Sequence, residues 1–429
     1  MKLHLRSLRA VTAALFPLFF AAPVLADVIL VDASGAADAD FTDLPPAFAV
    51  AHHNDLILIR AGNYSSFTTD KGVRVLGIEE GVYVSGISAI QALPTPKKFS
   101  MTNTRLDELI IEACRGHVAL CGAPEQPNGW QVLHDLKITD SDDVRLRRCK
   151  IYGTDMGGNN VWGPPAIEVI NSEVELVACR IVGKNCEFEA VNRGGGVGLF
   201  AGGNSRVRLS LTNVQGGWGS DGCDPWMGND GGRGAPALHV TGDAEVVVTG
   251  SGTEVIEGGD GGWGCGCSNC WGFGAPAIWM RDSAYVRVSG VILQPGQNGY
   301  GSGNYAVPID SGDQSVVDEP SSADPTLEMI GDAVPGQFLT MRVTGPPGGN
   351  VRYLLGRIPE LNYRVGGFGP DLLVEIRIVN PGTIPASGVR DYNFVLPGNI
   401  PQGMYFLGQA TVVYQGSTYR TPSQVVLVR

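Results

Sequence analysis

The chain has few charged residues, and basic residues are the scarcer kind. Only 17% of its 429 residues are charged, and 31 Lys and Arg stand against 43 Asp and Glu. A shortage of positive charge argues against nucleic acid as a partner. After residue 26 no stretch is apolar enough to cross a membrane, and the chain ends in an ordinary strand pattern, VVLVR. We therefore expect no nucleic-acid partner and no membrane span.

The one strongly apolar stretch lies within residues 1–26. A basic leader, MKLHLRSLRA, precedes VTAALFPLFFAAPVL, which is short for a membrane span. Val24-Leu25-Ala26 then suits the cleavage positions of a signal peptide. No lipid-attachment Cys follows. This pattern predicts cleavage near Ala26 and a secreted, periplasmic or cell-surface protein.

An internal repeat is the most informative feature of the remaining chain. Residues 144–153 read VRLRRCKIYG, and residues 174–183 read VELVACRIVG in the same frame. Looser copies begin at Val207, Val246 and Val286. Apolar residues alternate within a copy, which is the period-two pattern of a strand with one buried face. So short a unit cannot bury that face alone and must stack on its neighbours.

A second repeated stretch precedes three of these strands. It reads PPAIEVINS, APALHVTGD and APAIWMRDS from residues 164, 235 and 275. Each coil therefore holds at least two strands and a corner. The 60 Gly and 27 Pro also suit short strands and turns rather than long helices. The predicted fold is all-β, a parallel β-helix solenoid over residues 27–309.

One helix is expected, within residues 41–55. Asp43 is a suitable N-cap ahead of Pro45, and Leu44, Phe48 and Ala51 fall on one face. The segment lies between strand patterns at residues 27 and 56, where a solenoid needs its open edge covered.

A change of composition after residue 309 predicts a domain boundary. Residues 310–325, DSGDQSVVDEPSSADP, are acidic and rich in Ser, without apolar periodicity, and predict a linker. Residues 326–429 hold short alternating runs broken by turns and no Cys. They predict a small antiparallel β-sandwich of the immunoglobulin or fibronectin kind.

Two stretches resemble a known family. The run DFTDLPPAFAVAHHNDLILIRAGNYSSFTTDKGVRVLG and the coil ITDSDDVRLRRCKIYG are similar to secreted right-handed parallel β-helix proteins of the pectin-lyase-like superfamily. The resemblance spans residues 27–309 and implies a right-handed helix and polysaccharide ligands. The signatures of its enzymes are not intact. Asp142-Asp143 lacks a preceding Gly, and Arg115-Gly116-His117-Val118 lacks the second Gly of Gly-His-Gly.

Outward-facing residues of stacked coils form candidate columns. Arg145, Glu175 and Arg208 would make one column, and Lys150 and Arg180 another. In lyases of the superfamily, outward Arg and Lys together with Ca²⁺-binding carboxylates bind uronates and abstract a proton. The favoured alternative is a ladder of alternating charge on a solvated sheet. The catalytic candidates are Arg147, Lys150, Arg180, Asp142 and Asp143.

The stretch from residue 194 to 303 holds half of the glycines, 30 of 60, and five of the seven Trp. It contains runs such as GGWGSDGCDPWMGNDGGRG, which lack strand periodicity and are expected to protrude between coils as loops. Trp rings there suit stacking on sugars, although each loop folding over its own Trp is the alternative. The ligand-binding candidates are Trp162, Trp218, Trp226, Trp263 and Trp271.

The nine cysteines fall into two groups. Cys114, Cys149 and Cys179 are expected to form one buried stack of thiols. Cys223, Cys265, Cys267 and Cys270 lie in Gly-rich runs, where an exported chain favours disulfides of undetermined pairing over a four-thiolate Zn²⁺ site. Cys121 and Cys186 remain unassigned.

These observations favour an exported, monomeric β-helix protein that binds polysaccharide or a cell-surface glycan. A polysaccharide lyase or glycoside hydrolase acting on acidic polysaccharide is the alternative, and a structural envelope protein is a third. We expect no metal and no resident cofactor, with Ca²⁺ in the Asp-Gly runs as the one exception considered.

Overall fold

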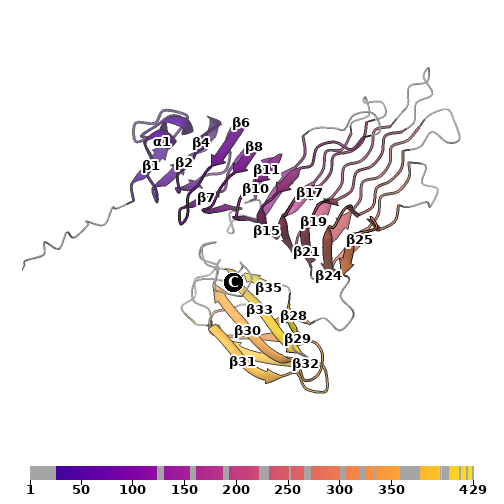
Figure 1. Ribbon diagram of the computed structural model, residues 1–429. Helices are drawn as coiled ribbons and strands as arrows, with labels where there is room; N and C mark the ends of the chain where they lie inside the picture. Colours follow the sequence, from indigo (N-terminus) through magenta and orange to yellow (C-terminus); the bar gives the residue numbers. More distant parts are fainter. Residues whose placement is uncertain are drawn as a thin grey trace, which may run out of the picture.

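The protein is nearly all β-structure, arranged in two long parallel sheets and two small antiparallel sheets (Figure 1). In the part of the chain described here, no helix is long and apolar enough to cross a membrane. The computed structural model describes residues 26–122, 130–154, 161–186, 193–221, 231–250, 253–264, 272–299, 306–318, 325–331, 334–357, 377–396, 398, 405–414, 417–421 and 424–427.

The first long sheet, called row A, runs the length of the solenoid. Each of its strands pairs in parallel with a strand of the next coil. Its strands are β1 (Val28–Val31), β2 (Leu56–Ile59), β5 (Arg74–Gly77), β7 (Lys98–Thr102), β9 (His117–Cys121), β12 (Asp143–Arg147), β15 (Glu173–Val177), β18 (Arg206–Ser210), β21 (Glu245–Thr249), β24 (Tyr285–Ser289) and β27 (Val316–Asp318).

The second long sheet has two arms, called rows B and C, which meet at the long strand β8 (Arg105–Glu112). Row B holds β10 (Gln131–His134), β13 (Cys149–Tyr152), β16 (Arg180–Val182), β19 (Asn213–Gln215), β22 (Val255–Glu257) and β25 (Ile292–Gln294). Row C holds β11 (Leu136–Thr139), β14 (Ile167–Ile170), β17 (Leu199–Gly202), β20 (Leu238–Val240), β23 (Ile278–Met280) and β26 (Ile309–Ser311). Ahead of β8 the sheet continues through β3 (Gly62–Ser65), β4 (Thr68–Thr69) and β6 (Val82–Gln91).

A complete coil therefore has three strands, one more than the minimum expected. The chain passes from row C to row A and then to row B, as in β14, β15 and β16, and a Gly-rich segment leads back to row C. Tight corners join the strands. At two of them Arg148 and Ala178 adopt φ of 50° and 52°, a left-handed conformation that bulky residues rarely take.

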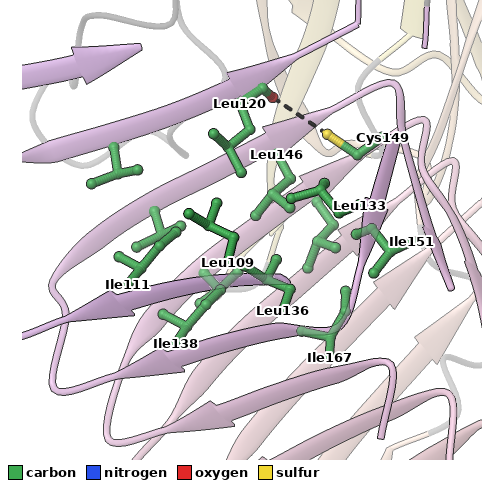
Figure 2. Packing of buried hydrophobic residues seen from close by; sticks show 14 of the residues in the cluster. Leu109, Ile111, Leu120, Leu133, Leu136, Ile138, Leu146, Cys149, Ile151 and Ile167 are labelled. Carbon is green, nitrogen blue, oxygen red and sulfur yellow. Dashed lines mark hydrogen bonds between the residues drawn. The ribbon is translucent and has the colours of Figure 1, made fainter. Parts of the chain in front are cut away.

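The repeat predicted from sequence sets the register. Val144, Val174, Val207, Val246 and Val286 are successive Cα partners along row A. All five are at most 1% exposed, and they belong to one continuous apolar core inside the coils. Figure 2 shows part of this core, where leucines and isoleucines of all three rows meet.

The expected stack of three thiols is only partly right, because Cys149 and Cys179 share one corner of the coils and Cys114 lies at another. Cys149 and Cys179 do stack at the corner between rows A and B, and the Cys149 thiol donates to the Leu120 carbonyl at 3.5 Å (Figure 2). Burial raises the pKa of Cys149 well above its ordinary value, so it stays a thiol. Cys114 lies instead at the corner between rows C and A, where its N–H donates to Ser141 Oγ at 3.1 Å.

The expected helix is confirmed as α1 (Leu44–Val50), with Asp43 as its N-cap. Leu44 and Phe48 are buried, and Phe48 stacks on Phe67 of the first coils with ring centroids 4.3 Å apart. The helix contacts β1, β3 and β4 and so covers the open end of the core.

The C-terminal region forms the expected antiparallel sheets around its own apolar core, separate from that of the solenoid. The linker prediction is wrong for residues 310–318, because Ile309 and Val317 pair with Ile278 and Val286 as a last coil. One sheet holds β28 (Thr326–Ile330), β29 (Phe338–Thr344) and β32 (Val389–Val395), and the other β30 (Asn350–Arg357), β31 (Arg377–Thr383), β33 (Tyr405–Tyr414), β34 (Ser417–Arg420) and β35 (Gln424–Leu427).

Replacing Leu176 with Asp should unfold the solenoid. It places an unpaired charge in the shared core, at a cost of several kcal/mol against a typical total stability of about 5–15 kcal/mol. Circular dichroism and size-exclusion chromatography measure the loss, and Arg180→Asp at an exposed position is the control. A stable, monomeric, β-rich Leu176→Asp protein would contradict this register.

Candidate functional site

As expected, the described parts of the Gly-rich stretches lie outside the helices and strands and extend beyond the coils, but backbone hydrogen bonds join them into a regular arrangement that was not expected. Outward segments leave row B at residues 183–186, 216–221, 258–263 and 295–299. Return segments enter row C at residues 193–198, 231–237 and 272–277. We call these seven segments the glycine lattice. In Figure 1 they are the thin coloured lines that run side by side beyond the solenoid strands.

Backbone hydrogen bonds join the lattice in two directions. Within a layer, Gly219 N–H donates to Asp260 O and Gly234 N–H to Phe273 O, both at 2.9 Å. Between the outward and return layers, one series of bonds of 2.8–3.0 Å crosses back and forth. It runs from Gly196 to Lys184, Gly217 to Gly196, Ala235 to Gly217, Gly259 to Ala235, Ala275 to Gly259 and Gly296 to Ala275.

The lattice has a period of three residues. In the run Gly216-Gly217-Trp218-Gly219, the glycines are buried and Trp218 is 47% exposed; Trp263 and Phe273 hold equivalent positions at 56% and 59%. A three-residue period with hydrogen bonds only between segments is typical of polyproline II conformation. Two positions in three must be Gly or small: a Cβ on Gly216 would lie 1.8 Å from Ala235 O.

Where the return segments enter row C, outward side chains form an aromatic column. Phe200, His239 and Trp279 are successive Cα partners on β17, β20 and β23. The ring centroids of Phe200 and His239 are 4.9 Å apart, and those of His239 and Trp279 are 4.3 Å apart. Trp162, from the segment before β14, packs edge-on against Trp279 at 4.9 Å. The four rings come from four coils.

A cavity of about 520 Å³ opens beside this column. Its polar lining includes Glu168, Arg233 and His239, and the Glu168 carboxylate is paired with Lys137 Nζ at 3.0 Å. Its lining residues are Val161, Trp162, Gly163, Pro165, Glu168, Val197, Phe200, Arg233 and His239. A concave apolar wall with a few polar groups at its rim is the usual form of a small-molecule site.

His239 is held neutral in this cavity. Burial among the rings lowers the pKa of its imidazole to about 4, and Arg281 adds to the effect. The Arg281 guanidinium lies 4.0 Å from the Trp279 ring centroid and is paired with Asp310 at 3.0 Å. At neutral pH the cavity thus presents an uncharged imidazole, which both donates and accepts hydrogen bonds.

The catalytic candidates do not meet in one groove. Lys150 and Arg180 are neighbours on row B, as expected, and Lys150 Nζ lies 4.9 Å from the Trp130 ring centroid. Arg147 lies on row A, across the corner at Arg148.

The acidic candidates are already paired. Asp142 binds Arg115 at 2.6 Å, and Asp143 binds His117 and Arg145, each at 3.0 Å. The predicted alignment of Arg145 with Glu175 is confirmed. The predicted solvated face is wrong for these two residues, because Arg145 is only 3% exposed and Glu175 only 6%.

The structure separates the Trp candidates. Trp162 lies at the cavity, whereas Trp218 and Trp263 lie on the outward layer of the lattice. Trp226, Trp271 and the cysteines 223, 265, 267 and 270 lie outside the described residues, so the disulfide prediction remains a prediction. The described cysteines, at 114, 121, 149, 179 and 186, are all free.

Among the described residues, Asp27, His52 and Asp55 in the first coil are spaced to hold a metal ion. This group does not lie in the Asp-Gly runs where Ca²⁺ was considered.

No protein-family model, curated protein sequence or solved structure significantly matches the chain. The residues themselves therefore carry the functional argument.

One signal in the sequence marks the aromatic column. Glu168, His239 and Trp279 occupy the same position in the three aligned stretches that precede row A strands. That position points outward by alternation, so an aromatic residue there is exposed unless something covers it. Phe200 has no such signal, because the stretch VGLFAGG lacks the small-Pro-Ala start.

Replacing Gly259 with Ala should destabilise the lattice. The added Cβ would lie 2.0 Å from Gly217 O, and overpacking of this kind costs about 1–3 kcal/mol or more. Gly398→Ala is the control, since nothing lies within 4 Å of that Cβ. Denaturant unfolding of both variants measures the difference; equal midpoints would contradict the close packing.

Because His239 is held neutral in the folded protein, the free energy of unfolding should decrease as the pH falls. The pKa of His239 when folded, about 4, is below the unfolded value near 6.5, so between these values the unfolded chain binds a proton that the folded chain does not. The loss, up to about 3 kcal/mol, begins as pH falls through 6.5 and is complete below 4. Denaturant unfolding at pH 7 and pH 4.5 should show a larger decrease in the wild type than in His239→Gln.

Proposed function

We propose that the protein is an exported saccharide-binding member of the right-handed, pectin-lyase-like β-helix superfamily, and that its ligand binds in the cavity beside the aromatic column. The observation that carries the proposal is the meeting of Trp162, Phe200 and His239 around about 520 Å³ of open space. Sugar rings have apolar C–H faces that pack on aromatic rings, and hydroxyl groups that need nearby polar partners.

The polar groups of the cavity suit a ligand rich in hydroxyls. The neutral His239 imidazole offers one donor and one acceptor, Arg233 offers a fork of N–H donors, and Glu168 offers carboxylate oxygens. Because Lys137 pairs with Glu168, that carboxylate adds little net negative charge to the rim.

The cavity has too few carboxylates in its described lining for the usual mechanism of glycoside hydrolysis, and this favours binding. Glycoside hydrolysis usually needs two carboxyl groups on either side of the scissile bond. Glu168 is the one carboxylate among the described lining residues. The lyase alternative needs basic and acidic residues that converge, and Asp143 and Arg147 stand at opposite ends of β12, about 13 Å apart along the strand.

Truncating the cavity aromatics should weaken binding. A panel of neutral and acidic polysaccharides identifies a ligand, and calorimetry then compares variants. Trp162→Ala and Phe200→Ala should each raise Kd about tenfold, equal to about 1.4 kcal/mol, within the range for aromatic contacts.

Trp218→Ala is the matched control, because that ring lies on the outward layer and should leave Kd unchanged. Loss of binding in Trp218→Ala with full binding in Trp162→Ala would move the site to the outward layer. Binding to no polysaccharide would favour the structural role, and release of shortened or unsaturated products would favour the enzyme.

A further inference from the structure

Asp55, just before β2, is a buried carboxylate for which the described residues provide no Lys or Arg partner. Only 3% of the residue is exposed. Its Oδ1 accepts the backbone N–H of Asp27 at 2.9 Å, and its Oδ2 accepts the backbone N–H of His52 at 2.6 Å. The exposed His52 imidazole lies 3.8 Å from Asp55 Oδ2 and is charged only when it is protonated, and the Asp27 carboxylate lies within 4.8 Å.

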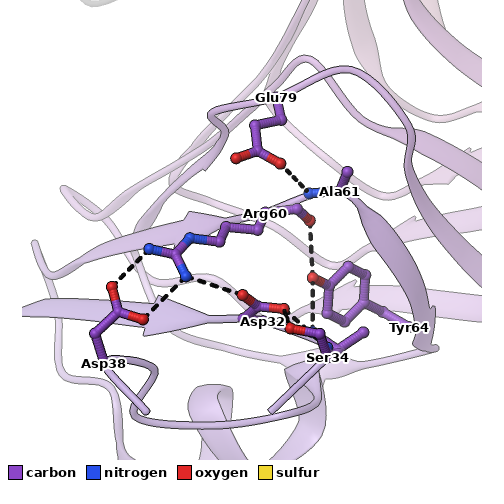
Figure 3. Close-up of polar contacts among 8 residues, drawn as sticks. Asp32, Ser34, Asp38, Arg60, Ala61, Tyr64 and Glu79 are labelled. Atoms are coloured by element: carbon purple, nitrogen blue, oxygen red, sulfur yellow. Dashed lines mark hydrogen bonds and ion pairs between the residues drawn. The ribbon is translucent and has the colours of Figure 1, made fainter. Parts of the chain in front are cut away.

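A second buried carboxylate in the same coil shows what Asp55 lacks. Asp32 is 5% exposed, and its oxygens bind the Ser34 hydroxyl at 2.7 Å and the Arg60 guanidinium at 2.9 Å (Figure 3). These hydrogen bonds hold the pKa of Asp32 below its usual value. Burying a carboxylate is costly unless a cation and hydrogen bonds compensate it. Asp32 has both, and Asp55 has the hydrogen bonds alone.

We propose that the missing cation is the chain's own N-terminus, so that Asp55 is a binding site for the α-ammonium group of Asp27. Hydrolysis of the Ala26–Asp27 peptide bond by a leader peptidase consumes one water, leaves a carboxylate on Ala26 and frees the amine of Asp27, which is protonated at neutral pH. The nitrogen is already 2.9 Å from Asp55 Oδ1, so no rearrangement is needed. The inference rests on removal of the leader and is independent of the saccharide site.

Processing would then stabilise one edge of the solenoid. Asp27 directly precedes β1, the terminal strand of row A, and an exposed terminal strand is prone to fraying and to pairing with other chains. In the precursor Asp55 receives a neutral amide N–H. In the mature chain it receives a charge-assisted hydrogen bond, which is shorter and stronger.

The test compares chains that begin at Asp27 with chains that begin at Ala26, each released from a fusion partner. Hydrogen exchange of the β1 amides should be at least fivefold slower in the Asp27 form. Asp55→Asn should abolish this difference, whereas Asp32→Asn, the matched control, should preserve it. If Asp55→Asn does not fold, the Asp27 form with and without Nα-acetylation gives the same comparison, and equal exchange there overturns the proposal.

Two further results bear on the same site. N-terminal sequencing of the exported protein should begin at Asp27, and a different start overturns the proposal. Zn²⁺ and Ca²⁺ should not change the exchange of β1. Three results together would overturn the proposal: either ion slows the exchange, EDTA reverses that effect, and the starting residue makes no difference. The cation would then be a metal held by Asp27, His52 and Asp55.

Discussion

The solenoid depends on the hydrogen bonds that join the backbone of each coil to the next in one fixed register. A shift of one residue would turn every buried side chain of a strand outward, so the apolar column from Val144 to Val286 holds the register in place. The same register aligns what lies outside the core. Phe200, His239 and Trp279 meet because the leucines and isoleucine before them are stacked partners. The cavity therefore depends on the packing of core residues that directly precede the aromatic residues in the chain.

Much of this architecture can be predicted from the sequence, because a repeated period-two pattern has one physical solution for short parallel strands. The Asp43 cap and the buried face of α1 are equally local signals. The end of the solenoid was not predictable in this way. In the last coil, β26 and β27 carry polar residues, and Val316 is 54% exposed at the outward position that Tyr285 holds in the coil before. A terminal coil therefore has the composition of a linker.

The candidate site was predicted only in part, for geometrical reasons. The neighbours Lys150 and Arg180 follow from the repeat, but the corner that separates them from Arg147 needs a left-handed Arg148, which no residue preference indicates. The sequence does not distinguish the corner of Cys114 from that of Cys149 and Cys179, because each Cys directly follows a left-handed residue, Ala113, Arg148 or Ala178. Trp162 was identified as a ligand contact by its residue type, whereas its partner rings come from coils far along the chain. The period of three in the Gly-rich runs matches neither the strand period of two nor the helix period of 3.6, so neither pattern indicates it.

The glycine lattice divides its residues into two kinds with different freedom to change. Positions such as Gly216 and Gly232 lie against backbone atoms of other segments and have no room for a side chain, while positions such as Trp218 and Trp263 carry exposed side chains. A substitution at Trp218 therefore changes the exposed surface without placing an atom between the backbones of the lattice. The chemistry of this exposed surface is therefore set by residues other than those that fix the glycine spacing.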